Sequence, residues 1–171
     1  GSPADSDFIG QVRFQAKDDG GNIHEYAKIF GQIADVTGGT EDGILNIRTV
    51  LNGTDTRRID LGVTETVFNE DSADLDFRIE SDGNTHALFL EGSTGNIGIG
   101  TSSPSSQVDG AANLVIGGTS DADTGMTFVT STSGQGLIHF SDATSGNARY
   151  DGFIGYEQNN QAMKFGTAQA E

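Results

Sequence analysis

Cysteine is absent from the 171-residue sequence, and proline occurs only twice. The lack of cysteine excludes disulfide bonds, thiolate nucleophiles and metal sites with cysteine ligands. No apolar run approaches the ~18 residues of a membrane span, and the N-terminus shows no apolar segment of a signal peptide. We therefore expect a protein without thiol chemistry and without membrane insertion.

Basic residues are also scarce, because nine Lys and Arg stand against 25 Asp and Glu, which gives a formal net charge of −16. Such a charge repels phosphate backbones and anionic lipid, so we expect no nucleic acid partner. The apolar class holds only 34% of the residues, and 25 residues are glycines that bury almost no side chain. A single chain of this composition has a thin hydrophobic core for its length.

Helix signals are few, since glycine interrupts every window that could hold an apolar stripe at helical spacing. Alternation with period two recurs instead, most strictly where Leu75, Phe77 and Ile79 alternate with three charged residues. Clusters rich in Gly, Asn and Asp separate such runs about every 8–12 residues. The sequence predicts an all-β fold, an elongated meander of short strands. We expect these three apolar residues to face a core, and Asp76, Arg78 and Glu80 to face water or a partner chain.

Changes in composition and in expected strand length divide the chain into four parts. Residues 1–6 are expected to be a leader with the remnant of a tag, and residues 7–62 a β-meander module that contains six of the nine basic residues. Residues 63–104 form a module of shorter strands that closes on Gly-Ile-Gly-Thr-x-x-Pro, and residues 105–171 form a C-terminal β module. Pro104 follows a serine and predicts one short helical turn at this break. We interpret the whole as a fragment of a longer chain.

Residues 95–101 read Gly-Asn-Ile-Gly-Ile-Gly-Thr and share only their glycine content with a nucleotide-binding loop. Ser103 stands where a dinucleotide fingerprint needs its third glycine, and no lysine between Lys28 and Lys164 completes a phosphate loop. We interpret the segment as a narrow strand in which Gly98 permits close backbone packing. No ligand site is expected there.

Carboxylates are abundant, but no catalytic or metal-ligating constellation can be named. A polysaccharide-cleaving enzyme needs two carboxylates about 5–10 Å apart, a distance that sequence spacing does not show. Clustered loop carboxylates suit calcium, although the Asp-x-Asp-x-Asp-Gly loop is missing, and this hypothesis stays open. His24, His86 and His139 lie far apart in the sequence, and no nucleophile elbow accompanies them. We expect no enzymatic activity, no catalytic or cofactor-binding residue, no metal ligand and no cofactor.

Several motifs follow one another in a characteristic order over most of the chain. Residues 67–84 are followed by an apolar strand and then by Gly-Ile-Gly-Thr-x-x-Pro at residues 98–104. This order resembles a module of tail-fibre and other structural proteins of tailed bacteriophages, especially marine ones. In two places the chain departs from that pattern: Tyr156-Glu157-Gln158 replaces a frequent Tyr-Asp-His, and the Ser-Asp-Arg-x-Leu-Lys motif of an autocleaving chaperone is missing. Further matching stretches are residues 29–33, 39–43, 51–54, 136–142, 145–147 and 150–156.

The resemblance implies a segment of a phage tail fibre, a structural component of the virion involved in host attachment. It implies an intertwined or side-by-side homotrimeric β-fibre of β-prism or β-sandwich-like modules, in which neighbouring copies complete the thin core. The implied partners are further copies of the chain, other tail or baseplate proteins, and a host surface glycan or protein receptor. One alternative is a β-rich extracellular filament or adhesin domain of a prokaryotic cell surface. A second alternative is a polysaccharide depolymerase.

Overall fold

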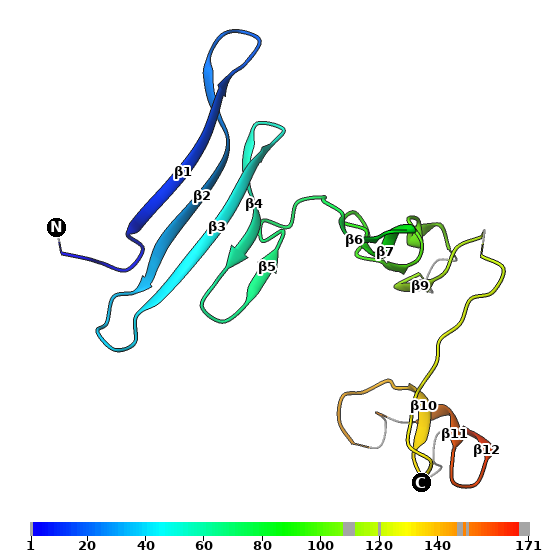
Figure 1. Ribbon diagram of the computed structural model, residues 1–171. Coiled ribbons are helices and arrows are strands. Elements are labelled where there is room, and N and C mark those ends of the chain that lie inside the picture. Colours follow the sequence, from blue (N-terminus) through cyan, green and yellow to red (C-terminus); the bar gives the residue numbers. More distant parts are fainter. Residues whose placement is uncertain (1, 108–111, 120, 147–148, 150, 168–171) are drawn as a thin grey trace. The chain divides into compact units, whose positions relative to one another are not determined.

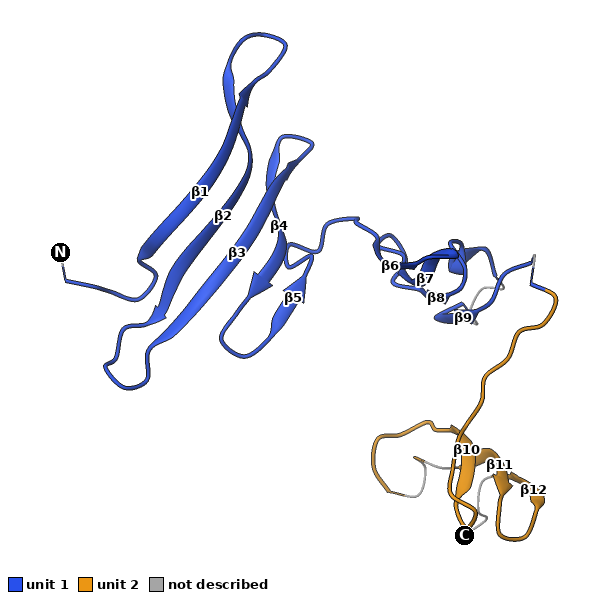
Figure 2. Ribbon diagram, viewed as in Figure 1, with its two compact units in different colours: residues 1–121 blue, residues 122–171 orange. Residues whose placement is uncertain are grey.

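The computed structural model describes residues 2–107, 112–119, 121–146, 149 and 151–167. The predicted all-β class is confirmed, because within these residues twelve strands form three sheets and no α-helix occurs (Figure 1). The chain divides into two compact units, residues 1–121 and residues 122–171 (Figure 2). Two of the sheets belong to the first unit and the third sheet belongs to the second unit.

The first sheet is an antiparallel meander whose five strands follow one another in sequence order. Asn52 and Gly53 connect β3 to β4, and their φ angles of 48° and 80° are both positive. A two-residue hairpin turn with this backbone matches the twist of its flanking strands, and Asn-Gly is its preferred sequence. The strands are β1 (Phe8–Lys17), β2 (Ile23–Asp35), β3 (Asp42–Leu51), β4 (Thr54–Leu61) and β5 (Thr66–Phe68).

The second sheet has the order β6-β7-β8-β9, and its last two strands are parallel. Parallel neighbours require a crossover connection, and the connection here holds one turn of 3-10 helix, η1 (Pro104–Ser106). The helical turn predicted at Pro104 is therefore confirmed, although the Ser103 side chain makes no capping hydrogen bond. The strands are β6 (Phe77–Ser81), β7 (Asn84–Leu90), β8 (Ile97–Ile99) and β9 (Leu114–Ile116).

The start of the crossover lies against one face of the second sheet at Gly98, and a small core forms on this face. Phe89 is 4% exposed and Pro104 is fully buried, while Gly98 on β8 is buried opposite Phe89. A Cβ atom added to Gly98 would lie 2.6 Å from the carbonyl oxygen of Thr101. Close packing at Gly98 is thus confirmed, and the neighbour is Thr101, at the start of the connection that leads to η1.

The expectation for residues 75–80 is only partly met. The strand begins at Phe77, so Leu75 precedes it. Alternation holds within the strand, because Phe77 pairs with Leu90 while Arg78 pairs with the buried Phe89. The apolar residues do not face a core, since Phe77 is half-buried and Ile79 is 50% exposed. The physical reason is that the start of the crossover packs at Gly98 on the opposite face of the sheet, the one that contains the buried Phe89.

The third sheet is an antiparallel meander of three strands within residues 122–171. Gly155 and Gly166 stand opposite Leu137 and Phe153, and the missing Cβ atoms leave room for these two larger side chains on one face. The strands are β10 (Gln135–Phe140), β11 (Gly152–Glu157) and β12 (Ala162–Gly166).

Candidate functional site

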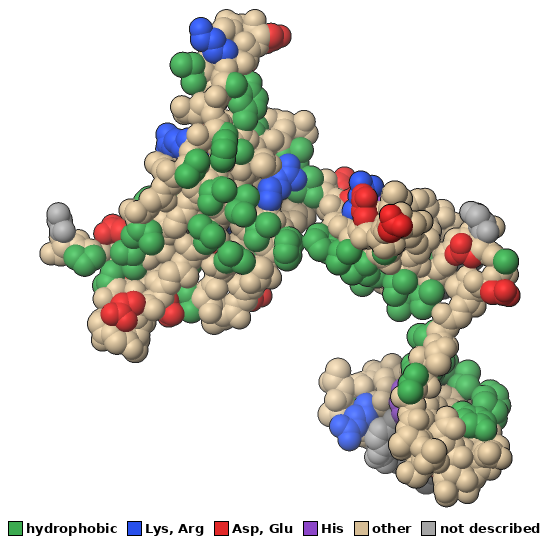
Figure 3. Space-filling model, in the orientation of Figure 1, with side chains coloured by type: hydrophobic (Ala, Val, Ile, Leu, Met, Phe, Trp, Pro, Cys, Tyr) green, Lys and Arg blue, Asp and Glu red, His purple; other side chains and the backbone are tan. Residues whose placement is uncertain are grey.

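One face of the first sheet carries a row of apolar side chains with one member from each strand. The pairing register places these residues opposite one another, and Gly31, Leu45 and Leu61 form the next row. The two ends of the first row, Val12 and Phe68, are 56% and 53% exposed. Figure 3 shows hydrophobic side chains gathered over these strands. The row consists of Val12, Ile29, Ile47, Ile59 and Phe68.

The opposite face of the first sheet carries ion pairs that link β1, β2, β3 and β4 with the segment after β5. Consecutive pairs share a residue, so four cations and four carboxylates form one network of alternating sign. Their charges cancel, and the face therefore needs no charged partner from outside the sheet. In order, the pairs are Arg13–Glu25 (3.0 Å), Glu25–Lys28 (3.3 Å), Lys28–Asp55 (2.8 Å), Asp55–Arg48 (3.2 Å), Arg48–Asp71 (3.5 Å), Asp71–Arg57 (3.1 Å) and Arg57–Asp60 (3.0 Å).

Asp71 ties the segment after β5 to strand β4. Its carboxylate accepts a hydrogen bond from the backbone N–H of Arg57 at 2.6 Å and another from the Arg57 Nε at 3.1 Å. The backbone bond is the main cause that lowers the pKa of Asp71 below its ordinary value. Asn69 holds the same segment, since its backbone N–H donates to the Arg58 carbonyl oxygen at 3.0 Å.

The second sheet presents two apolar rows on the side opposite its small core. Ile79 and Leu114 are 50% and 53% exposed, and Ile97 and Ile99 are 38% and 41% exposed. Strand β8 thus points Gly98 toward the crossover and its two isoleucines toward the surface. The register and the alternation of the strands give two rows: Phe77, Leu90, Ile97 and Leu114, and beside them Ile79, Leu88, Ile99 and Ile116.

Phe68 and Phe77 join the apolar row of the first sheet to a row of the second sheet. Their ring centroids lie 5.1 Å apart, and the ring planes are tilted by 49°. This separation is within the favourable range for aromatic pairs. We call the joined rows the nine-residue stripe, which has one residue from each of β1 to β9: Val12, Ile29, Ile47, Ile59, Phe68, Phe77, Leu90, Ile97 and Leu114.

The third sheet repeats the same two-faced design in the second unit. Ile138, Ile154 and Phe165 form a row across its three strands, and Tyr156 pairs with Met163 in the next row. Phe165 is 74% exposed, and the other residues of this face are at least 36% exposed. All three sheets therefore combine one apolar face, largely open to solvent, with a second face of different chemistry.

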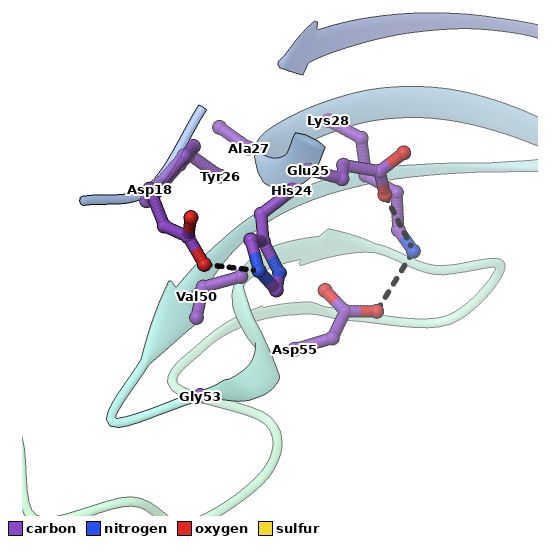
Figure 4. Close-up of a pocket in the computed structure, with 9 residues that line it drawn as sticks. All are labelled: Asp18, His24, Glu25, Tyr26, Ala27, Lys28, Val50, Gly53 and Asp55. Atoms are coloured by element: carbon purple, nitrogen blue, oxygen red, sulfur yellow. Dashed lines mark hydrogen bonds and ion pairs between the residues drawn. The ribbon is translucent and has the colours of Figure 1, made fainter. Parts of the chain in front are cut away.

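A cleft of about 480 Å³ opens beside β2, beyond the pair Ala27–Thr49, where β2 has no further partner on β3 (Figure 4). His24 Nε2 lies 3.0 Å from Asp18 Oδ2, and Lys28 Nζ contacts Glu25 and Asp55. The nine residues that line the cleft include no serine, threonine or cysteine. The histidine and carboxylate there have no nucleophile of these types to activate.

Each of the three histidines has its own surroundings. His24 is in the cleft, His86 packs its ring edge-on against Phe89 at 5.1 Å, and His139 lies 6.0 Å from the ring of Phe153. Within the described ranges, no three or more His, Cys, Asp or Glu residues are grouped so that they could hold a metal ion. Within the first unit, His24 and His86 have different surroundings.

Comparisons with protein-family models, with curated proteins and with solved structures find no match to this chain. Among the residues that the structure describes, no helix is both long and apolar enough to cross a membrane. The apolar faces of the three sheets remain largely exposed to solvent in a single chain, and a function must account for this exposure.

Proposed function

We propose that this chain is a structural, self-associating segment of a virion fibre, of the tail-fibre type found in tailed bacteriophages. Three copies assemble around a common axis, and contacts between copies cover the apolar faces. The main support for this proposal is that each of the three successive sheets exposes an apolar face. Among the described residues, the buried apolar side chains are only Phe30, Phe89, Ala112 and Pro104.

The energetic balance of a single chain supports this proposal. Ordering one residue costs about 1–2 kcal/mol of backbone entropy, whereas fully burying a large apolar side chain stabilises by about 1.5–3 kcal/mol. Four buried residues, of which only Phe30 and Phe89 have large side chains, do not offset the ordering of three sheets. Burial between copies supplies the missing stabilisation, as in other proteins whose core forms only on association.

The charge distribution also favours a stable filament that remains dispersed. The net charge of −16 makes assembled particles repel one another, while the apolar faces carry the contacts within a particle. The order of motifs over most of the chain supports the phage assignment over a prokaryotic surface filament. In this role the other partners are further tail or baseplate proteins and a glycan or protein on the host surface.

Electron microscopy of the isolated chain tests the proposal. We expect class averages of elongated particles, with threefold symmetry when the particle is viewed along its long axis. Compact particles of the size of one chain would contradict the proposed structural role. Averages that show another symmetry would keep self-association and overturn the trimer.

A further inference from the structure

We infer that the nine-residue stripe is the surface on which a second copy of this chain docks, and that the ion-pair face of the first sheet points away from that copy. This inference rests on the proposed self-association. It adds which face of the first unit forms the contact, which residues lie in it, and that the ion-pair face points away from the partner copy. It concerns the first unit only. The apolar face of the third sheet is a separate surface, and the experiment below treats it separately.

The continuity of the stripe is the first argument for this surface. The contact between Phe68 and Phe77, with ring centroids 5.1 Å apart, connects two sheets that otherwise have separate hydrogen-bond ladders. Without this contact each sheet would offer a short apolar patch of its own. With it, apolar side chains from all nine strands of the first unit belong to one surface.

The size of the surface fits a partner as large as another copy. Each partner of a standard protein interface contributes about 20–30 residues. The nine stripe residues and eight apolar neighbours on the same faces approach that number, and they lie on strands, which favours packing against another sheet. The eight neighbours are Phe14, Ala27, Leu45, Leu61, Ile79, Leu88, Ile99 and Ile116.

The chemistry of the two faces selects a second copy as the partner. None of the nine stripe residues has a charged or hydrogen-bonding side chain, and Arg58 beside them already donates from its Nε to Thr49 Oγ1. The same apolar face of another copy therefore complements the stripe. On the opposite face of the first sheet, four cations and four carboxylates neutralise one another. Contact through the stripe leaves these eight charges hydrated, whereas burying them would be costly.

Matched pairs of variants in the full chain test the inference, because neighbouring residues on one strand lie on opposite faces and are all about half exposed. Val12 is 56% exposed and the Arg13 side chain 51%, and Ile79 is 50% exposed and the Arg78 side chain 51%. We expect V12N and I79N each to raise the concentration at which the assembly dissociates by about tenfold or more. R13N and R78N should raise it by less than about threefold.

Cysteine labelling gives a second test that does not require a destabilised variant. The chain contains no cysteine, so a single introduced thiol reports only its own position. In the assembly, a thiol-reactive dye should label V12C at least about tenfold more slowly than R13C, because the stripe is covered. In chemically unfolded protein the two rates should agree.

The outcomes separate this inference from the proposed function. If the variants at Val12 in the stripe and at Ile79 in the neighbouring row assemble like the wild type and V12C reacts as fast as R13C, this surface is not the interface. If I154N and F165N on the third sheet then dissociate the assembly, self-association holds through that sheet instead. A wild-type chain that stays monomeric would contradict both the inference and the proposed function.

Discussion

Lys28 on β2 and Asp55 on β4 form an ion pair across the intervening strand β3, with Lys28 Nζ 2.8 Å from Asp55 Oδ2. Arg48 on β3 contacts the same carboxylate oxygen, at 3.2 Å from its Nε. One carboxylate thus links three strands on the polar face. The charges of that face pair with one another within the sheet. The apolar side chains on the opposite face have no second layer to cover them in the first sheet of one chain.

The Asp71 carboxylate gives a prediction for the pH dependence of stability. Its pKa is lowered in the folded chain, first by the backbone N–H of Arg57, so its contribution is present above the unfolded pKa and is lost as the pH falls through the folded pKa. We expect the free energy of unfolding of the wild type to fall more steeply than that of D71N as the pH is lowered from about 5 to 2. Denaturant titrations at several pH values measure this difference. Parallel curves for the two proteins would show that Asp71 has no such role.

Gly98 should not tolerate a side chain. A Cβ there would lie 2.6 Å from the Thr101 carbonyl oxygen, and the backbone must move to relieve this contact. We expect G98A to cost about 1–3 kcal/mol of stability. Gly83 is the matched control, because a Cβ there meets nothing within 4 Å and its φ is not positive. G83A should change stability by less than about 0.5 kcal/mol, and equal thermal shifts for both variants would contradict the close packing at Gly98.

The hairpin between β3 and β4 depends on Gly53. Its φ of 80° is in the left-handed region, where a Cβ is strained, so we expect G53A to cost about 1–2 kcal/mol. N52G is the control, because glycine adopts the φ of 48° at Asn52 without strain. Thermal unfolding of both variants checks the prediction. An unchanged melting temperature for G53A would mean that the turn has another conformation.

We expect no hydrolysis of polysaccharide by this chain. The His24–Asp18 pair has no serine, threonine or cysteine among the residues that line its cleft, and each carboxylate there contacts a cation or His24. Incubation with host capsule or exopolysaccharide should release no reducing ends. Release that E25Q or D55N abolishes would replace the structural role with the depolymerase alternative.

Local features of the fold could be predicted because their causes lie within a few residues. Alternation predicts strand β6, Asn52-Gly53 fits a two-residue hairpin turn, and Pro104 predicts the helical turn that became η1. The glycine in the middle of β8 likewise predicts close packing at Gly98. Each of these features depends on backbone preferences that a short stretch of sequence already contains.

The apolar and ion-pair surfaces could not be predicted, because they depend on which strands pair and in which register. Phe68 and Phe77 belong to different sheets, and nothing in their spacing indicates that the rings touch. Alternation places Ile79 on an apolar face but does not tell whether another layer covers that face, and the structure leaves it 50% exposed. The pair Lys28–Asp55 requires strands β2 and β4 to lie on either side of β3, which is a property of the whole sheet.

The mass of the full chain in solution tests the central claim most directly. Light scattering at micromolar concentration should give about 54 kDa, three times the chain mass of 17.9 kDa, and the value should fall only on strong dilution. A mass near 17.9 kDa at every concentration, with the β-sheet circular dichroism signal intact, would show that one chain is stable with its apolar faces uncovered. That result would contradict the proposed self-association.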